Sequence, residues 1–247
     1  MKPFRRFLHD LVGVYADGLR TMRGLPLLFA ALIAWEFFQH VIEYRIGFFT
    51  SRAAAQAVAH DPSRMALGWV KMILVYVGGF FTIRFLAGRQ GAPVMRPPLR
   101  SILRYLPYVG YALLVFAGIF YADLLVAPSR LNTAREIIGG AQLILEPLLM
   151  PWIVSAATDG AVRTPWQSAR LLGWGYPRAF ALFFLARLPV GAAHQFLGTY
   201  GVGRPTLPLW PMLAADAFVV GLLIATIPAI AVRVARRTTL DQDGLRE

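Results

Sequence analysis

Hydrophobic runs of about twenty residues recur along the whole chain and are separated by short basic segments. A run of this length can cross the hydrocarbon core of a bilayer as an α-helix. We predict six spanning helices, at residues 25–45, 66–87, 105–127, 137–157, 177–198 and 209–232. The pattern therefore predicts an all-α, polytopic membrane protein, folded as a helical bundle in one membrane-embedded domain over 1–247.

Two amphipathic helices are predicted outside the spans, and residues 46–65 form a connection in which the segment SRAAAQAVA can be a short helix. Residues 3–23 place apolar side chains at helical spacing on one face and charged side chains on the others. A basic amphipathic helix before a span lies in the membrane interface, or packs on the ends of the bundle. Residues 165–172 predict a second interfacial helix, and both would lie on the cytoplasmic face.

Prolines divide the pattern further. Pro147 and Pro151 lie in the fourth span and predict a kinked or broken helix. Pro26, Pro107 and Pro177 each follow a basic amphipathic stretch and precede a spanning run, and proline is favourable near a helix start. This order predicts three repeated units of an amphipathic helix and a helix hairpin. The alternative is the alternation of basic and apolar segments found in any polytopic protein.

Composition and charge agree with a membrane protein. The chain is 57% hydrophobic and 15% charged, with a net charge of +12. Because the basic residues lie between apolar runs, they fit anionic lipid head groups and not nucleic acid. The chain has no cysteine, which excludes disulfides and thiolate metal sites. Further partners would be other proteins or a second copy in a homo-oligomer.

The basic residues are distributed unevenly between the two sides of the predicted bundle. Sixteen Lys and Arg residues lie on the side of the termini, and six lie on the other side. Because loops rich in Lys and Arg stay in the cytoplasm, this bias predicts two cytoplasmic termini. The expected location is a bacterial-type inner membrane.

Residues 148–188 carry one motif, in which a span is followed by a short loop, an amphipathic helix, a glycine and another span. Trp166, Ser168, Leu171 and Gly173 occupy the motif positions, although Trp166 replaces a small residue. This segment resembles uncharacterised bacterial six-helix inner-membrane families related to the membrane domain of glycerophosphodiester phosphodiesterases. The resemblance implies a fold and a membrane location, and it carries over no functional residues.

Ionisable residues inside the spans are the candidate functional residues. Glu36, His40 and Glu43 share one helical face in the first span, since they are spaced four and then three residues apart. Glu146 and Arg187 lie near mid-span in their own helices. A secondary set lies nearer the non-cytoplasmic side: Lys71, Asp123, His194 and Asp216. Such groups usually face partners or water inside a bundle.

Three functions are compatible with these residues. We favour a non-enzymatic accessory or membrane-organising protein, in which Arg187 pairs with Glu36 or Glu146, and Lys71 pairs with Glu43. The alternative is a transporter or channel that uses Glu36, His40, Glu146 and Arg187 as a site for a proton, a cation or a small polar ligand. The third is a membrane-embedded metalloenzyme. No cofactor is expected; the alternative is a metal ion held by Glu36, His40 and Glu43.

Overall fold

The computed structural model describes residues 2–88 and 94–243, and every regular element in these ranges is helical. In chain order the elements are α1 (Lys2–Gly24), α2 (Pro26–Arg45), α3 (Arg52–Ala57), α4 (Pro62–Ala87), α5 (Leu99–Phe120), α6 (Ala122–Leu125), the 3-10 turn η1 (Pro128–Arg130), α7 (Leu131–Thr158), α8 (Pro165–Leu172), the 3-10 turn η2 (Gly173–Gly175), α9 (Tyr176–Gly201) and α10 (Thr206–Asp243).

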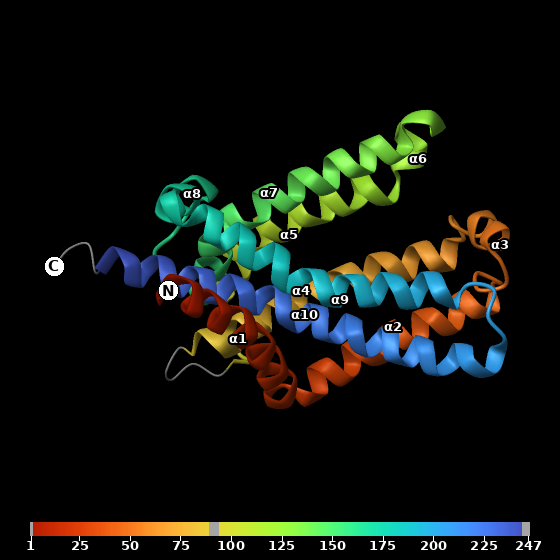
Figure 1. The fold of residues 1–247 in the computed structure, drawn as a ribbon, viewed down its shortest axis with the longest axis horizontal. Helices are drawn as coiled ribbons and strands as arrows, with labels where there is room; N and C mark the ends of the chain where they lie inside the picture. Colours follow the sequence, from red (N-terminus) through yellow and green to blue (C-terminus); the bar gives the residue numbers. More distant parts are fainter. Residues whose placement is uncertain (1, 89–93, 244–247) are drawn as a thin grey trace.

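The prediction of a six-span helical bundle is confirmed, because six helical segments are long and apolar enough to cross a membrane. Both termini lie at one end of the bundle (Figure 1), which we call the terminal end. The opposite end carries α3, α6 and the connection from α9 to α10, and we call it the distal end. Arg89 and Arg246, two of the arginines counted on the side of the termini, lie outside the described residues.

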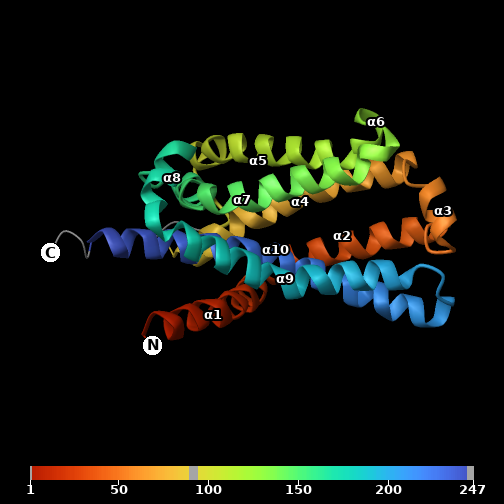
Figure 2. The same ribbon diagram turned by 45° about the horizontal axis from the view of Figure 1, so that its top comes forward.

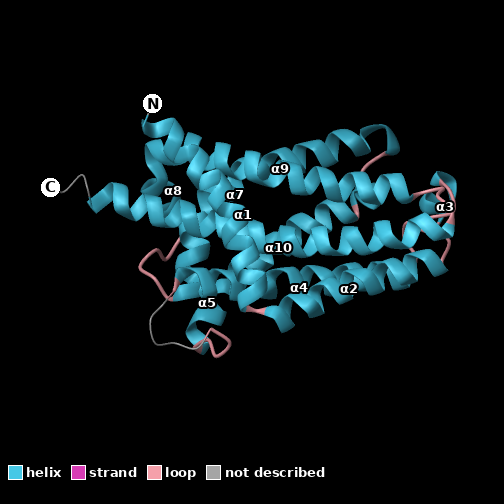
Figure 3. Cartoon of the chain, turned by 60° about the horizontal axis from the view of Figure 1, so that its bottom comes forward, coloured by secondary structure: helices cyan, strands magenta, loops and turns pink. Residues whose placement is uncertain are grey.

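Helix α10 is the centre of the bundle. It packs against α1, α2, α4, α7 and α9, and Figures 2 and 3 show it running along the bundle from the terminal end to the distal end beside α9. Small side chains make this close contact possible, since Ala217, Ala225 and Ala229 are almost completely buried. A polar residue on α10 therefore meets side chains from several helices.

The third span lies earlier in the chain than predicted. Helix α5 starts at Leu99, directly after Pro98, and ends at Phe120, whereas the sequence pattern predicted a loop over 88–104 and a span over 105–127. The basic amphipathic stretch is thus the first part of α5 and forms no separate helix. Pro107 lies inside α5, while Pro26 and Pro177 lie at the starts of α2 and α9. The proline part of the predicted repeat is therefore wrong for its middle unit.

Helix α8 braces the proline-containing part of α7. The Ser168 hydroxyl is fully buried; it donates to the Leu148 carbonyl at 2.7 Å and accepts from the Trp152 N–H at 3.1 Å. In a regular helix these two backbone groups, four residues apart, are partners of each other, and next to Pro147 and Pro151 the serine hydroxyl pairs with both. Helix α7 runs without a break from Leu131 to Thr158, so of the two predicted alternatives, a kinked or a broken helix, the broken helix is not found.

Replacing Ser168 with Ala is expected to lower the free energy of unfolding by about 1 kcal/mol, because two backbone groups lose a buried partner. Denaturant titration in mixed micelles measures this change. Exposed Ser129→Ala serves as the control. An equal effect of the two substitutions would show that α8 does not stabilise α7 through this hydroxyl.

Candidate functional site

A polar cavity of about 510 Å³ opens at the distal end of the bundle. Helices α2, α4, α9 and α10 contribute to it, and α3 supplies part of its wall. Six of the residues singled out in the sequence line this distal cavity: Glu36, His40, Glu43, Lys71, His194 and Asp216. The structure thus brings the stripe on α2 together with side chains from three other helices.

Asp216 joins two histidines at the floor of the distal cavity. Its carboxylate oxygens lie 3.0 Å from His40 Nε2 and 2.7 Å from His194 Nδ1, and the residue is completely buried. The other ring nitrogen of His40, Nδ1, lies 3.1 Å from Glu43 Oε2. A neutral imidazole donates from one nitrogen only, whereas an imidazolium donates to both carboxylates. The hydrogen bonds of this group therefore depend on one proton.

Glu36 is paired on one side only. Its Oε1 accepts a hydrogen bond from Lys71 Nζ at 3.0 Å and lies 3.8 Å from His40 Nε2. Its Oε2 is buried and has no hydrogen-bond partner among the described residues. An ionised carboxylate offers about four acceptor positions, so Glu36 retains the capacity to bind another donor or a cation.

Two contributors to the cavity were missed in the sequence. Arg64 Nε donates to Glu43 Oε1 at 3.1 Å, and Gln39 Nε2 donates to the same oxygen at 3.2 Å. Arg64 was assigned to an extramembrane connection, but α4 starts at Pro62, with Asp61 as its N-cap. Arg64 and Lys71 are seven residues apart, which places them on one face of α4. This seven-residue spacing is the sequence signal from which Arg64 could have been identified as a cavity residue.

The predicted pairing is wrong in two respects. Lys71 pairs with Glu36 and not with Glu43, which instead pairs with Arg64. Arg187 forms no ion pair with Glu36 or Glu146 in the part of the chain that the structure describes. Its guanidinium instead lies over the Phe183 ring, 5.7 Å from the centroid.

Glu146 and Arg187 belong to a second, smaller cavity and not to the set around Glu36. This cavity measures about 190 Å³ and is lined mainly by α4, α5, α7, α9 and α10, including three tyrosines. Tyr108 donates to Glu146 Oε1 at 2.6 Å, while Oε2 is buried without a hydrogen-bond partner in the described chain. We call it the tyrosine cavity; it has polar groups but lacks the histidines of the distal cavity.

Asp123 lies outside both cavities, although it was predicted to lie at the end of a span. Helix α5 ends at Phe120, and Asp123 lies in the short helix α6, where its carboxylate contacts the His60 ring. This hydrogen bond from His60 lowers the pKa of Asp123 from its ordinary value. The contact joins the α2–α4 connection to the α5–α7 connection at the distal end.

Asp159 forms a similar contact at the terminal end. It ends α7 in a left-handed conformation with φ +58°, and Arg104 NH1 donates to its Oδ1 at 2.7 Å. The hydrogen bond from Arg104 is the main cause that lowers the pKa of Asp159. A carboxyl group whose pKa is lower in the folded state stabilises that state above its unfolded pKa, and this contribution is lost as the pH falls through the folded pKa.

Stability is therefore expected to fall on acidification below about pH 4, and Asp159→Asn should remove part of this dependence. Asn tolerates the left-handed conformation, so the backbone is retained. The measurement is the unfolding midpoint of both proteins from near-neutral pH downward. The difference between the unfolding midpoints of the two proteins should become smaller as the pH falls. A constant difference would show that ionised Asp159 does not contribute.

An apolar layer closes the distal cavity toward the terminal end. Val220 and Ile224 follow Asp216 by one and two turns on α10, and Leu32 and Phe29 precede Glu36 on α2. These side chains belong to one buried apolar cluster. This apolar cluster therefore lies between the cavity residues and the terminal end.

Glu36, His40 and Asp216 are arranged so that they could hold a metal ion. One ligand atom from each lies within 4.8 Å of the others, and all three residues are buried. Glu43 cannot complete this set on the same side, because it faces His40 Nδ1 while Glu36 and Asp216 face Nε2. Imidazole and carboxylate ligands suit zinc, manganese and iron.

The site must be interpreted from this geometry. The resemblance of residues 148–188 to membrane domains of phosphodiesterase-related families stays a prediction. Comparison of the chain with protein-family models, with curated proteins and with solved structures gave no match.

Proposed function

We propose that this chain is a transporter that receives a small cationic or polar solute in the distal cavity. The observation that carries the proposal is that Glu36, His40 and Asp216, although buried, line a cavity of about 510 Å³ at the distal end. A cluster that only joined helices would need no such space. The opening of the cavity gives a solute access to the charged groups. Buried charged groups are costly in a membrane and often mark a substrate or ion pathway.

The closed side of the cavity supports transport rather than an open channel. The layer of Phe29, Leu32, Val220 and Ile224 separates the cavity from the terminal end. Carriers with alternating access expose a mid-membrane site to one side at a time. The His40–Asp216 hydrogen bond supplies a group whose contacts depend on a proton, which would let proton binding drive the exchange of solute.

The proposed setting is a bacterial-type inner membrane with both termini in the cytoplasm. The bias of Lys and Arg toward the terminal end supports this orientation, because basic loops stay cytoplasmic. The distal cavity would then open to the non-cytoplasmic side. Anionic lipids would contact the basic terminal end.

A packing role in an accessory protein is the second candidate. It is favoured by the pairing of all three cavity carboxylates, since Glu36 contacts Lys71, Glu43 contacts Arg64 and Asp216 contacts two histidines. Paired charges stabilise a fold without any solute. The two candidates differ in whether water and solute reach these groups.

Uptake into proteoliposomes tests the proposal. The solutes tested should be protons, whose uptake is followed with a pH-sensitive dye, and monovalent and divalent cations. We expect saturable uptake of one of them by the parent, and a loss of at least about tenfold in Asp216→Asn and Glu36→Gln. Asp123→Asn is the matched control, because this carboxylate also contacts a histidine but lies outside the cavity.

Cysteine labelling gives a second readout, since the chain has no native cysteine. Thr199→Cys, at the cavity wall, should react with a membrane-impermeant thiol reagent added on the distal side. Thr226→Cys, fully buried beyond the apolar layer, should be protected. Absence of uptake for every solute tested, together with protection of both cysteines, would reject transport and leave the packing role. Bound metal found by element analysis, without uptake, would indicate a metal centre instead.

A further inference from the structure

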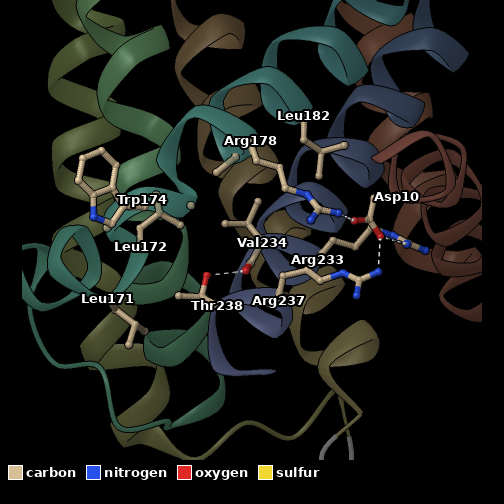
Figure 4. A pocket seen from close by; sticks show the side chains of 13 residues that line it. Asp10, Leu171, Leu172, Trp174, Arg178, Leu182, Arg233, Val234, Arg237 and Thr238 are labelled. Carbon is tan, nitrogen blue, oxygen red and sulfur yellow. Dashed lines mark hydrogen bonds and ion pairs between the residues drawn. The ribbon is translucent and has the colours of Figure 1, made fainter. Parts of the chain in front are cut away.

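A separate cavity of about 420 Å³ lies at the terminal end, between α1, η2, the start of α9 and the end of α10. Three arginines line it: Arg178, Arg233 and Arg237. Among the side chains that the structure describes, Asp10 is the one acidic residue in its wall. Figure 4 shows the three guanidinium groups directed toward Asp10, with Trp174, Leu171 and Leu172 on the other side of the cavity.

Asp10 orients the arginines but cannot neutralise them. It is buried; its Oδ2 accepts from Arg178 at 2.7 Å and its Oδ1 accepts from Arg237 at 3.1 Å. Arg233 is held mainly by Asp17, to which its NH2 lies at 2.7 Å. Two carboxylates therefore serve three cavity arginines, and Asp17 also contacts Arg20. Among the described side chains of this cavity, positive charge is therefore in excess.

The wall of α1 is shaped to admit Arg233. A Cβ atom at Gly13 would lie 2.3 Å from Arg233 NH2, so only glycine leaves room for the guanidinium on this face of α1. Asp10, Gly13 and Asp17 are spaced three and four residues apart, on one helical face. The sequence of α1 thus provides a cradle for an arginine from the far end of the chain.

We propose that this cavity binds the phosphate group of an anionic ligand. The planar guanidinium has five N–H donors and matches phosphate oxygens in pairs, so Arg178 and Arg237 can bind a phosphate with donors that Asp10 leaves unused. The apolar side of the cavity, with Leu171 and Leu172, would contact the remainder of the ligand. Such basic pockets between helices at a membrane face bind lipid head groups.

Two sources share this phosphate chemistry: the head group of an anionic phospholipid, and a soluble phosphate. The fully exposed Trp174 at the cavity wall fits a lipid, because tryptophan favours the head-group level of a bilayer. The phosphate site shares no residue with the distal cavity, so the two proposals can be tested independently of each other.

The test measures thermal stabilisation of the purified full chain by added phosphatidylglycerol, by phosphatidylcholine and by inorganic phosphate. Native mass spectrometry counts the phosphatidylglycerol molecules retained. We expect saturable stabilisation by phosphatidylglycerol and one retained molecule per chain. Arg237→Gln should lower the affinity for phosphatidylglycerol about tenfold. The double variant Arg178→Gln with Arg237→Gln should show no stabilisation by phosphatidylglycerol. Arg170→Gln, an exposed arginine on neighbouring α8 outside this cavity, is the matched control.

Stabilisation by inorganic phosphate alone, with the same dependence on Arg237, would support the phosphate site and assign it to a soluble ligand. Equal effects of Arg237→Gln and Arg170→Gln, or no stabilisation by any phosphate compound, would overturn the proposal. If the double variant does not fold, Arg237→Gln decides the outcome, since Asp10 keeps Arg178 and Arg233 as partners.

Discussion

Replacing Lys71 with Met is expected to lower the free energy of unfolding by about 3–5 kcal/mol, because it leaves the Glu36 carboxylate buried without its cation. Glu36 is 1% exposed, and Lys71 Nζ, at 3.0 Å, is the lysine that pairs with it. Glu36→Gln should cost less, since Lys71 is more exposed and borders the open cavity. Denaturant titration in mixed micelles compares these variants.

The combined variant distinguishes a broken ion pair from a general packing defect. Adding Glu36→Gln to Lys71→Met removes both charges and should restore most of the lost stability. Arg45→Met is the control, because Arg45 is an exposed cation at the end of α2, and its loss should change stability by less than about 0.5 kcal/mol. If Lys71→Met costs no more than Arg45→Met, the Glu36–Lys71 pair does not stabilise the bundle.

The helices could be predicted from the sequence because their signals are local. Hydrophobic runs located the spans, and Thr164 and Pro165 start α8 at the predicted position. The third span was misplaced because Pro98 and the basic stretch after it read as a loop. Its early end at Phe120 then moved Asp123 out of the membrane-spanning helix.

The partners of the charged residues could not be predicted in the same way. Rise per residue gives the depth of a side chain, but contact also requires the rotation of each helix about its axis and the order of helices in the bundle. Glu36 and Glu146 were grouped by depth, yet they line different cavities. His40 and Asp216, 176 residues apart in the chain, form the central contact of the distal cavity.

The helical face shared by Glu36, His40 and Glu43 could be predicted from the sequence, because all three residues lie on one helix. It identified one wall of the cavity. The neighbouring helix α4 contributes Lys71 and Arg64, whose spacing carries the same periodic signal. A search for charged residues seven apart, extended past the ends of the predicted spans, would therefore have found these two groups of residues, but not their pairing.

Gly78→Leu is expected to lower the free energy of unfolding by about 3 kcal/mol, because no space exists for its side chain. A Cβ at Gly78 would lie 2.9 Å from Ile224 Cγ2 and 2.9 Å from Leu32 Cδ1. Helices α2, α4 and α10 meet here, directly below the distal cavity. A leucine would push these helices apart and disturb the apolar layer that closes the cavity.

Gly110→Leu is the matched control, because Gly110 is also inside a span and a Cβ there meets nothing within 4 Å. Leucine also favours the helix over glycine by about 0.5–1 kcal/mol, so this variant should be neutral or slightly more stable. In Gly78→Leu, a disturbed layer should also expose Thr226→Cys to labelling from the distal side. Loss of stability with Thr226→Cys still protected would show that the layer is not what keeps the cavity closed.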